Sequence, residues 1–212
     1  MRTLLIATLA FGCVATAADD EKTATKKRPK AEQTVKTTEV KVVPRFPSPP
    51  LVLKVPETWT KEVNANSMRL ATYATPAAGD GEKGELTVFS FPGGGGSVGQ
   101  NLARWRDQFQ ADGRTVSVKK GKAGKAKSEY HIIELGGTFM KSVGPPIAGR
   151  KEAQAGSKML GVILTLKEDG GDKAAGIYFL KLVGPAASID AQAKNFRKSF
   201  GGKKASETAY EL

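Results

Sequence analysis

The chain has 212 residues, with 33 Lys and Arg against 21 Asp and Glu, for a formal net charge of +12. Its only cysteine is Cys13 and its only histidine is His131, so the sequence excludes an intrachain disulfide and any metal site built from several cysteines or histidines. The positive balance favours anionic partners.

The N-terminus has the order of a secretory signal peptide over residues 1–17. A positive start at Arg2 precedes an apolar run from Leu4 to Val14, and the small residues Ala15 and Ala17 follow. The run is too short for a permanent membrane helix. We expect cleavage after Ala17, or after Ala18 as a second choice, and a secreted or periplasmic product with no transmembrane segment.

A lipid anchor is the alternative reading of the same segment. Ala10-Phe11-Gly12-Cys13 resembles a lipoprotein box, but Phe11 is too bulky for that motif. Cleavage at Ala17 would remove Cys13, so the mature chain would hold no cysteine nucleophile and no thiolate metal ligand.

Composition divides the remainder into three parts. Residues 18–50 are rich in Lys, Thr, Glu and Pro and poor in large apolar side chains, which predicts a disordered basic tether. Residues 51–201 are long enough for one hydrophobic core and predict a single α+β domain. Residues 202–212 predict a flexible tail.

Seven segments of the domain alternate apolar and polar residues and are bounded by Gly, Pro or Asp, as in strands. They are 51–55, 68–73, 86–91, 115–118, 130–135, 158–166 and 177–183. The last two flank Glu168–Asp172, a sequence typical of a hairpin turn. Their nearly continuous apolar character indicates central strands covered on both faces.

Two helices are predicted between the strands. Val98, Leu102, Trp105 and Phe109 form one apolar stripe, preceded by Ser97 and Gln100 as a capping box. The second stripe comprises Ile189, Ala193, Phe196 and Phe200, with Ser188 as the expected cap. The expected fold is therefore an α/β sandwich with a mainly antiparallel sheet of about seven strands and two principal helices, in the order βββ-α-ββββ-α.

The segment Gly94-x-Gly96-x-x-Gly99 has the spacing of a dinucleotide fingerprint. The neighbouring elements predict no βαβ unit, and Gln100-Asn101 stands where a phosphate loop has Lys-Ser/Thr. We expect a plain strand-to-helix connection here and no bound cofactor.

An ordered series of motifs resembles a group of uncharacterised secreted bacterial proteins distantly similar to the PsbP fold. The series is Pro56-x-x-Trp59, Met68-Arg69, Phe91-x-Gly93 through Gly96-Ser97, Asn101-x-x-Arg104-Trp105-x-x-Gln108-Phe109, Leu135-x-Gly137-Thr138-Phe139, Met159-Leu160-Gly161 and Tyr178-Phe179-x-Lys181-Leu182-x-Gly184-Pro185. The resemblance implies an α/β sandwich on an antiparallel sheet over residues 51–200. It implies no activity: plant PsbP proteins assist the oxygen-evolving complex, and no manganese or calcium motif is present here.

Five lysines are concentrated in what the pattern predicts to be a loop between two strands: Lys119, Lys120, Lys122, Lys125 and Lys127. Such a loop is a candidate contact for an anionic polymer or lipid surface, through an attraction that salt weakens. The interpretation we prefer is a solvated loop whose charge keeps the protein soluble. Binding of nucleic acid is disfavoured because no aromatic residues are interleaved for base stacking.

Four further residues are candidates for a ligand cleft: Trp59, Arg69, Arg104 and Trp105. An indole combines apolar area with one hydrogen-bond donor, and a guanidinium binds anions. The alternative is that both indoles fill the core and that the arginines are solvated.

Two hypotheses about function remain. The preferred one is an exported noncatalytic binding or interaction module of the cell envelope, whose partner is an envelope protein, an anionic polymer or a lipid surface. The other is a hydrolase-like envelope enzyme whose carboxylates or His131 meet only in the folded chain. The sequence shows no nucleophile motif, metal set or acid–base pair, so we assign no catalytic residue and no metal ligand.

Overall fold

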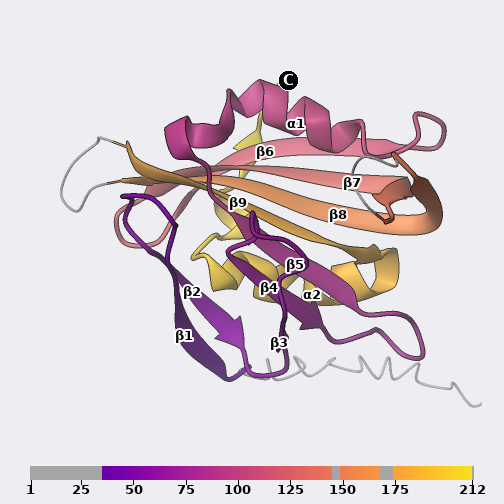
Figure 1. Cartoon of the computed structure of the whole chain (residues 1–212), viewed down its shortest axis with the longest axis horizontal. Coiled ribbons are helices and arrows are strands. Elements are labelled where there is room, and N and C mark those ends of the chain that lie inside the picture. The colour runs from indigo at the N-terminus through magenta and orange to yellow at the C-terminus, as the bar shows by residue number, and fades with distance from the viewer. Residues whose placement is uncertain (1–34, 145–148, 168–173, 212) are drawn as a thin grey trace, which may run out of the picture. The chain divides into compact units, whose positions relative to one another are not determined.

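The computed structural model describes residues 35–144, 149–167 and 174–211. In that part of the chain, eight strands form the main sheet, and all neighbouring pairs are antiparallel (Figure 1). In sheet order they are β10 (Thr208–Ala209), β6 (Thr115–Ala123), β7 (Ser128–Ser142), β8 (Lys151–Lys167), β9 (Ala174–Pro185), β5 (Gly84–Phe89), β4 (Ala71–Thr75) and β3 (Thr60–Glu62).

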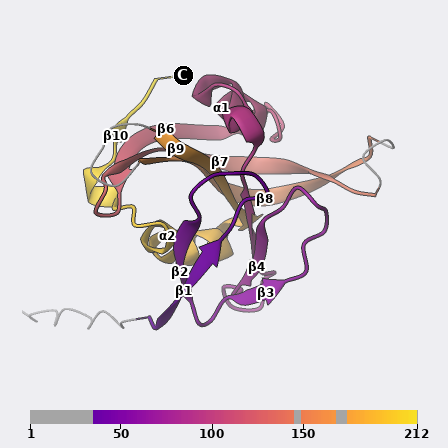
Figure 2. The same ribbon diagram turned by 60° about the vertical axis from the view of Figure 1, so that its left-hand side comes forward.

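The two helices lie on opposite faces of this sheet (Figures 1 and 2). Helix α1 (Val98–Arg106) packs on one face. Helix α2 (Ala186–Ser199) packs on the other, together with a small sheet of β1 (Thr37–Val42) and β2 (Leu51–Pro56). Two hydrophobic clusters follow from this arrangement, one under α1 and one under α2 and the small sheet. The expected antiparallel α+β class is confirmed.

Strand β9 shows how the alternation sorts side chains between the clusters. Leu180 and Leu182 are fully buried in the α2 cluster, whereas Phe179 belongs to the α1 cluster. Because successive side chains of a strand point to opposite faces, Lys181 lies on the α1 side. A charged residue is thus placed at the middle of a central strand.

Four of the predicted strands are at least five residues longer than the sequence indicated. The segments 115–118, 130–135, 158–166 and 177–183 are parts of β6, β7, β8 and β9, which have 9, 15, 17 and 12 residues. The prediction ended the second segment before Gly136-Gly137, but β7 continues through them. Gly137 has φ +134°, and the register with β8 shifts between Gly137 and Phe139, so these residues form a bulge rather than a chain reversal.

The boundaries of the folded part also differ from the prediction. The expected tether, 18–50, contains β1, which pairs with β2 from Thr37 opposite Pro56 to Val42 opposite Leu51. Val42 is only 4% exposed and belongs to the α2 cluster, against which the partly buried Val40 also packs. The signal peptide, Cys13 and the first part of the tether lie outside the described residues.

The expected flexible tail, 202–212, holds a 3-10 turn, η3 (Lys204–Ser206), and β10, which pairs with β6. An ion pair between Arg197 Nε and Glu207 Oε1, 2.7 Å apart, fixes this segment. Both side chains are almost fully buried, at 4% and 1% exposure. Sequence composition did not reveal this segment because its order depends on partners elsewhere in the chain: Arg197, which pairs with Glu207, and His131, whose ring packs against Tyr210.

The helix starts were predicted with mixed success. The capping box is confirmed: Ser97 accepts from Gln100 N–H, and the Gln100 side chain accepts from Ser97 N–H. Ser188, in contrast, is not the cap of α2, which starts at Ala186 after Pro185. Its hydroxyl donates to Glu82 O at 2.7 Å and so joins the helix to the turn before β5.

The Gly-rich segment is a strand-to-helix connection, as expected. It forms a 3-10 turn, η1 (Pro92–Gly95), between β5 and α1. Because the described sheet is antiparallel throughout, this turn does not belong to a βαβ unit. The predicted turn at 168–172 lies outside the described residues.

Candidate ligand-binding cleft

The α1 side of the main sheet is only partly covered. Trp105 of α1 lies so close to β8 that a Cβ added to Gly161 would be 2.5 Å from its Cε3 atom. After α1 the chain runs beside β7, and Met140 N–H donates to Gln108 O at 2.8 Å. Beyond this segment, over β9 and β5, the sheet carries an open cleft of about 900 Å³.

Lys181 is the central group of this cleft. Its Nζ donates to Gln108 Oε1 at 2.7 Å and lies 4.9 Å from the centroid of the Phe139 ring. Within the described part of the chain, no carboxylate forms an ion pair with it. An ammonium has three hydrogens to donate, so this environment leaves donor capacity facing the cleft.

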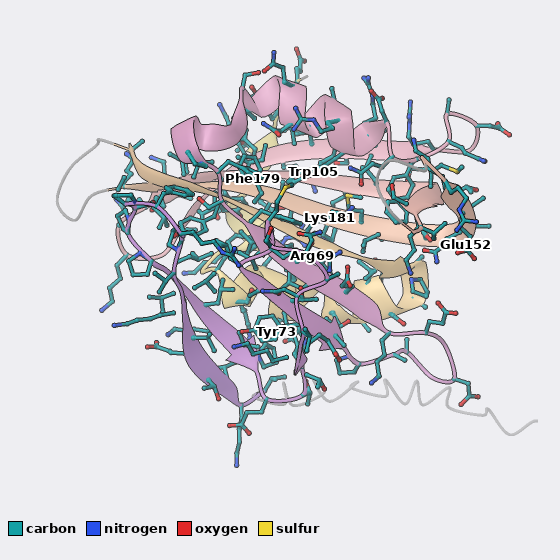
Figure 3. All side chains as sticks on the ribbon, in the orientation of Figure 1. Arg69, Tyr73, Trp105, Glu152, Phe179 and Lys181 are labelled. Carbon is teal, nitrogen blue, oxygen red and sulfur yellow. The ribbon has the colours of Figure 1, made fainter. Side chains whose placement is uncertain are left out.

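The charge of Lys181 is destabilised by its position. Burial lowers the pKa of its ammonium to about 8, with Glu85 acting to raise that pKa and Arg69 acting to lower it further. The usual origin of such a shift is loss of hydration without a compensating partner. In Figure 3, Lys181 is labelled close to Arg69, on the part of the sheet that α1 leaves uncovered.

Arg69 supplies the second cation, from the segment immediately before β4. Its Nη1 lies 3.1 Å from Glu85 Oε2 on β5, and the side chain is 19% exposed. Its Nε is buried and has no hydrogen-bond partner among the described residues. A buried donor without a partner costs about 1–3 kcal/mol, so this N–H favours an acceptor that enters the cleft.

The rim of the cleft carries charges of both signs. Lys141 of β7, Lys151 and Glu152 of β8, and Glu82 and Lys83 before β5 all line it and are exposed. Figure 3 shows Glu152 on the long β7–β8 ribbon, at a distance from the label of Lys181. The interior is cationic, and the rim is mixed.

The four sequence candidates for a ligand cleft do not come together. Arg69 lines the cleft. Trp59 is buried on the α2 side, where its Nε1 donates to Gln192 Oε1 at 3.0 Å, and Trp105 is buried on the α1 side. Arg104 donates to Asn101 Oδ1 at 3.0 Å on its own helix. The two indoles therefore occupy cores on opposite faces of the sheet, and neither lines the cleft.

The five lysines predicted to form a loop belong mainly to a strand. Lys119, Lys120 and Lys122 are residues of β6, and only Lys125 and Lys127 lie in the turn that follows. The pattern obscured the strand because lysines replace apolar residues near a sheet edge, where charged side chains discourage pairing with other chains. They do not line the cleft.

His131 lies on β7, as expected, and is 7% exposed. Its ring packs edge-on against Tyr210 with centroids 4.6 Å apart, and burial lowers the pKa of the imidazole. It does not line the cleft, and Glu129 Oε1 is 4.0 Å from its Nε2. No group of three or more His, Cys, Asp or Glu residues gathers as a metal site within the described ranges.

Lys181, Gln108 and Phe139 were not predicted to be site residues. A signal was present for Lys181, since it is a lysine inside the apolar run 177–183, which was itself predicted to be a covered central strand. Gln108 and Phe139 carried no comparable signal, because their proximity to Lys181 depends on how the chain after α1 lies along β7.

Comparisons with known proteins leave the family open. The chain matches no protein-family model and no curated protein. A solved structure of a protein of unknown function, PA94 from Pseudomonas aeruginosa, is similar at 11% identity and a TM-score of 0.37, over 76% of this chain and 92% of that one. Among the described residues, no helix has the length and apolar character needed to span a membrane.

Proposed function

We propose that this chain is an exported binding module of the cell envelope and that its cleft holds the anionic group of a small molecule or of a partner's side chain. Lys181 and Arg69 are the residues that would contact the anion. The expectation of export comes from the signal-peptide pattern of residues 1–17.

The observation that carries this proposal is unused donor capacity on two neighbouring cations. Lys181 has no carboxylate partner in the described part of the chain, and Arg69 Nε has no acceptor there. An entering carboxylate would satisfy both, and charge-assisted hydrogen bonds are shorter and stronger than neutral ones. The open mouth of the cleft gives a small ligand access to Lys181, whereas Arg69 Nε is enclosed by protein atoms and an acceptor reaches it only if the Arg69 side chain shifts.

Calorimetric titration with malonate tests the proposal, with malonamide as the neutral analogue. We expect malonate to bind and malonamide not to bind. Lys181→Met should weaken malonate binding by tenfold or more, since a hydrogen bond to a charged group contributes roughly 1.5–3 kcal/mol. Lys122→Met removes the same charge from an exposed position outside the cleft and should leave binding unchanged.

Equal weakening by Lys181→Met and Lys122→Met would contradict the proposal, because it would show that net charge rather than the cleft attracts the anion. High salt screens both the charge of the cleft and the net charge of the protein, so salt dependence does not distinguish the two explanations. Both variants are therefore compared at one ionic strength.

An envelope enzyme remains the second candidate, and it is favoured by the position of Lys181 in the cleft with no carboxylate paired to it in the described part of the chain. A lysine amine with a pKa of about 8 can act as a base or as a nucleophile near neutral pH. The reactive group would then be Lys181 rather than His131, whose surroundings are Glu129, Lys120 and Tyr210.

A further inference from the structure

The lysines that line the cleft differ in their access to water. Lys83, Lys141 and Lys151 stand exposed on the rim, whereas Lys181 is partly buried at the floor. Its stem rises from β9 between strands β8 and β5, so the amine reaches the cleft from the middle of the sheet. Among the described cleft lysines it is the one that a small ligand meets only after entering.

The neighbours of Lys181 position its amine without neutralising it. Gln108 Oε1 accepts one N–H at 2.7 Å, and the Phe139 ring flanks the nitrogen. Glu85, the carboxylate that could pair with the ammonium, is instead bound by Arg69 at 3.1 Å. The amine is therefore oriented, but no carboxylate among the described residues forms an ion pair with it.

These conditions favour the neutral amine, which is the nucleophilic form. With a pKa of about 8, about a tenth of Lys181 is neutral at pH 7, a few hundred times more than for an ordinary lysine. Desolvation of a lysine beside another cation is a recognised way to activate it towards carbonyl compounds.

We propose that Lys181 forms a reversible imine with small aldehydes or 2-oxo acids whose carboxylate lies against Arg69. This inference rests on the proposed anion-binding role of the cleft. The Arg69 guanidinium and the Lys181 amine then contact two different groups of one ligand, the carboxylate and the adjacent carbonyl carbon.

The reaction balances without any oxidant or reductant. The neutral amine attacks the carbonyl carbon, a C–N bond forms, and the oxygen takes up a proton to give a carbinolamine. Loss of that hydroxyl as water breaks the C–O bond, and the nitrogen gives up its second proton, leaving an imine and one water. Hydrolysis reverses each step and releases the ligand.

Reductive trapping with glyoxylate and cyanoborohydride tests the inference on the chain lacking residues 1–17. Glyoxylate carries both a carboxylate and an aldehyde, and cyanoborohydride converts an imine into a stable secondary amine. Peptide mapping by mass spectrometry then measures modification at each lysine. We expect Lys181 to be modified roughly tenfold faster than exposed Lys122 and Lys151.

Three controls separate the role of the amine from that of the anion site. Arg69→Gln should slow modification of Lys181 while leaving Lys122 unchanged. Glycolate, which has the carboxylate but no carbonyl, should protect Lys181 by occupying the same position. Acetaldehyde, which lacks the carboxylate, should show a smaller preference for Lys181.

The outcomes distinguish the two proposals. Preferential, glycolate-sensitive labelling of Lys181 supports both. Labelling in proportion to exposure, with malonate and glycolate still binding in the cleft, overturns the imine and leaves the binding function intact. Labelling in proportion to exposure without any binding of these anions overturns both.

Discussion

Replacing Lys181 by Met should stabilise the domain at neutral pH, in a way that disappears as the pH rises. The pKa of this amine falls from 10.5 to about 8 on folding, mainly through burial. Between these pH values the unfolded chain binds more protons than the folded one, so the free energy of unfolding rises with pH there. Below pH 8 the full cost of burying the charge is present.

The size of the effect follows from the shift. A change of about 2.5 pKa units corresponds to on the order of 3 kcal/mol at pH 7, since one unit is worth 1.36 kcal/mol. Of this, about 2 kcal/mol should be recovered between pH 7 and pH 9.5. The substitution also removes the hydrogen bond to Gln108 and the contact with Phe139, which changes the free energy of unfolding by an amount that does not depend on pH. The part that changes with pH is therefore the contribution of the Lys181 charge.

Urea denaturation of the wild type and of Lys181→Met at pH 7, 8, 9 and 9.5 measures this change. As the pH rises, the free energy of unfolding of the wild type should increase relative to that of Lys181→Met. Groups that titrate in both chains cancel from this difference, so it reports the Lys181 amine. Lys122→Met controls for the loss of one charge. A difference that stays constant from pH 7 to pH 9.5 would show that folding does not lower the pKa of the Lys181 amine.

Three further substitutions test the packing that holds the cleft in place. Gly161→Ala should cost about 1–3 kcal/mol by urea denaturation and alter Trp105 fluorescence, because the added methyl overlaps the indole; unchanged stability would contradict the close approach. Arg197→Met should cost roughly 3–5 kcal/mol and increase hydrogen exchange in β6 and β10, since it leaves the Glu207 carboxylate buried without its partner; protection equal to wild type would argue against the C-terminal anchor. Ser97→Ala should cost about 1 kcal/mol, with Ser97→Asp close to wild type, because only the alanine variant loses the cap; equal losses in both would argue against the capping role.

Much of the fold could be predicted because each element buries its own apolar stripe. The strand at 177–183 and the helix at Val98 were recognised from spacing alone, and both lie where the pattern placed them. The prediction was wrong where order comes from distant partners. Strand β10 depends on Arg197 and on the edge of β6, and neither is visible in the local sequence of the tail.

The cleft could not be derived in the same way. Arg69, Gln108 and Lys181 come from three separated segments, and their meeting depends on the pairing of β9 with β5 and on where α1 ends. Antiparallel pairing is consistent with the sequence, but the register that places Thr87 opposite Lys181 is a property of the assembled sheet. The lysine inside an apolar strand was the one local sign that a polar site was nearby.

The most direct test of the account is the titration of Lys181 itself. Carbon-13 NMR of the lysine Cε atoms, with Lys181→Met to assign the signal, gives its pKa in the folded domain. We predict a midpoint near 8, because burial and Arg69 disfavour the ammonium. A midpoint above 10 would show an ordinary solvated lysine. It would contradict the claim that Lys181 is a buried amine without an ion-pair partner at the floor of the cleft.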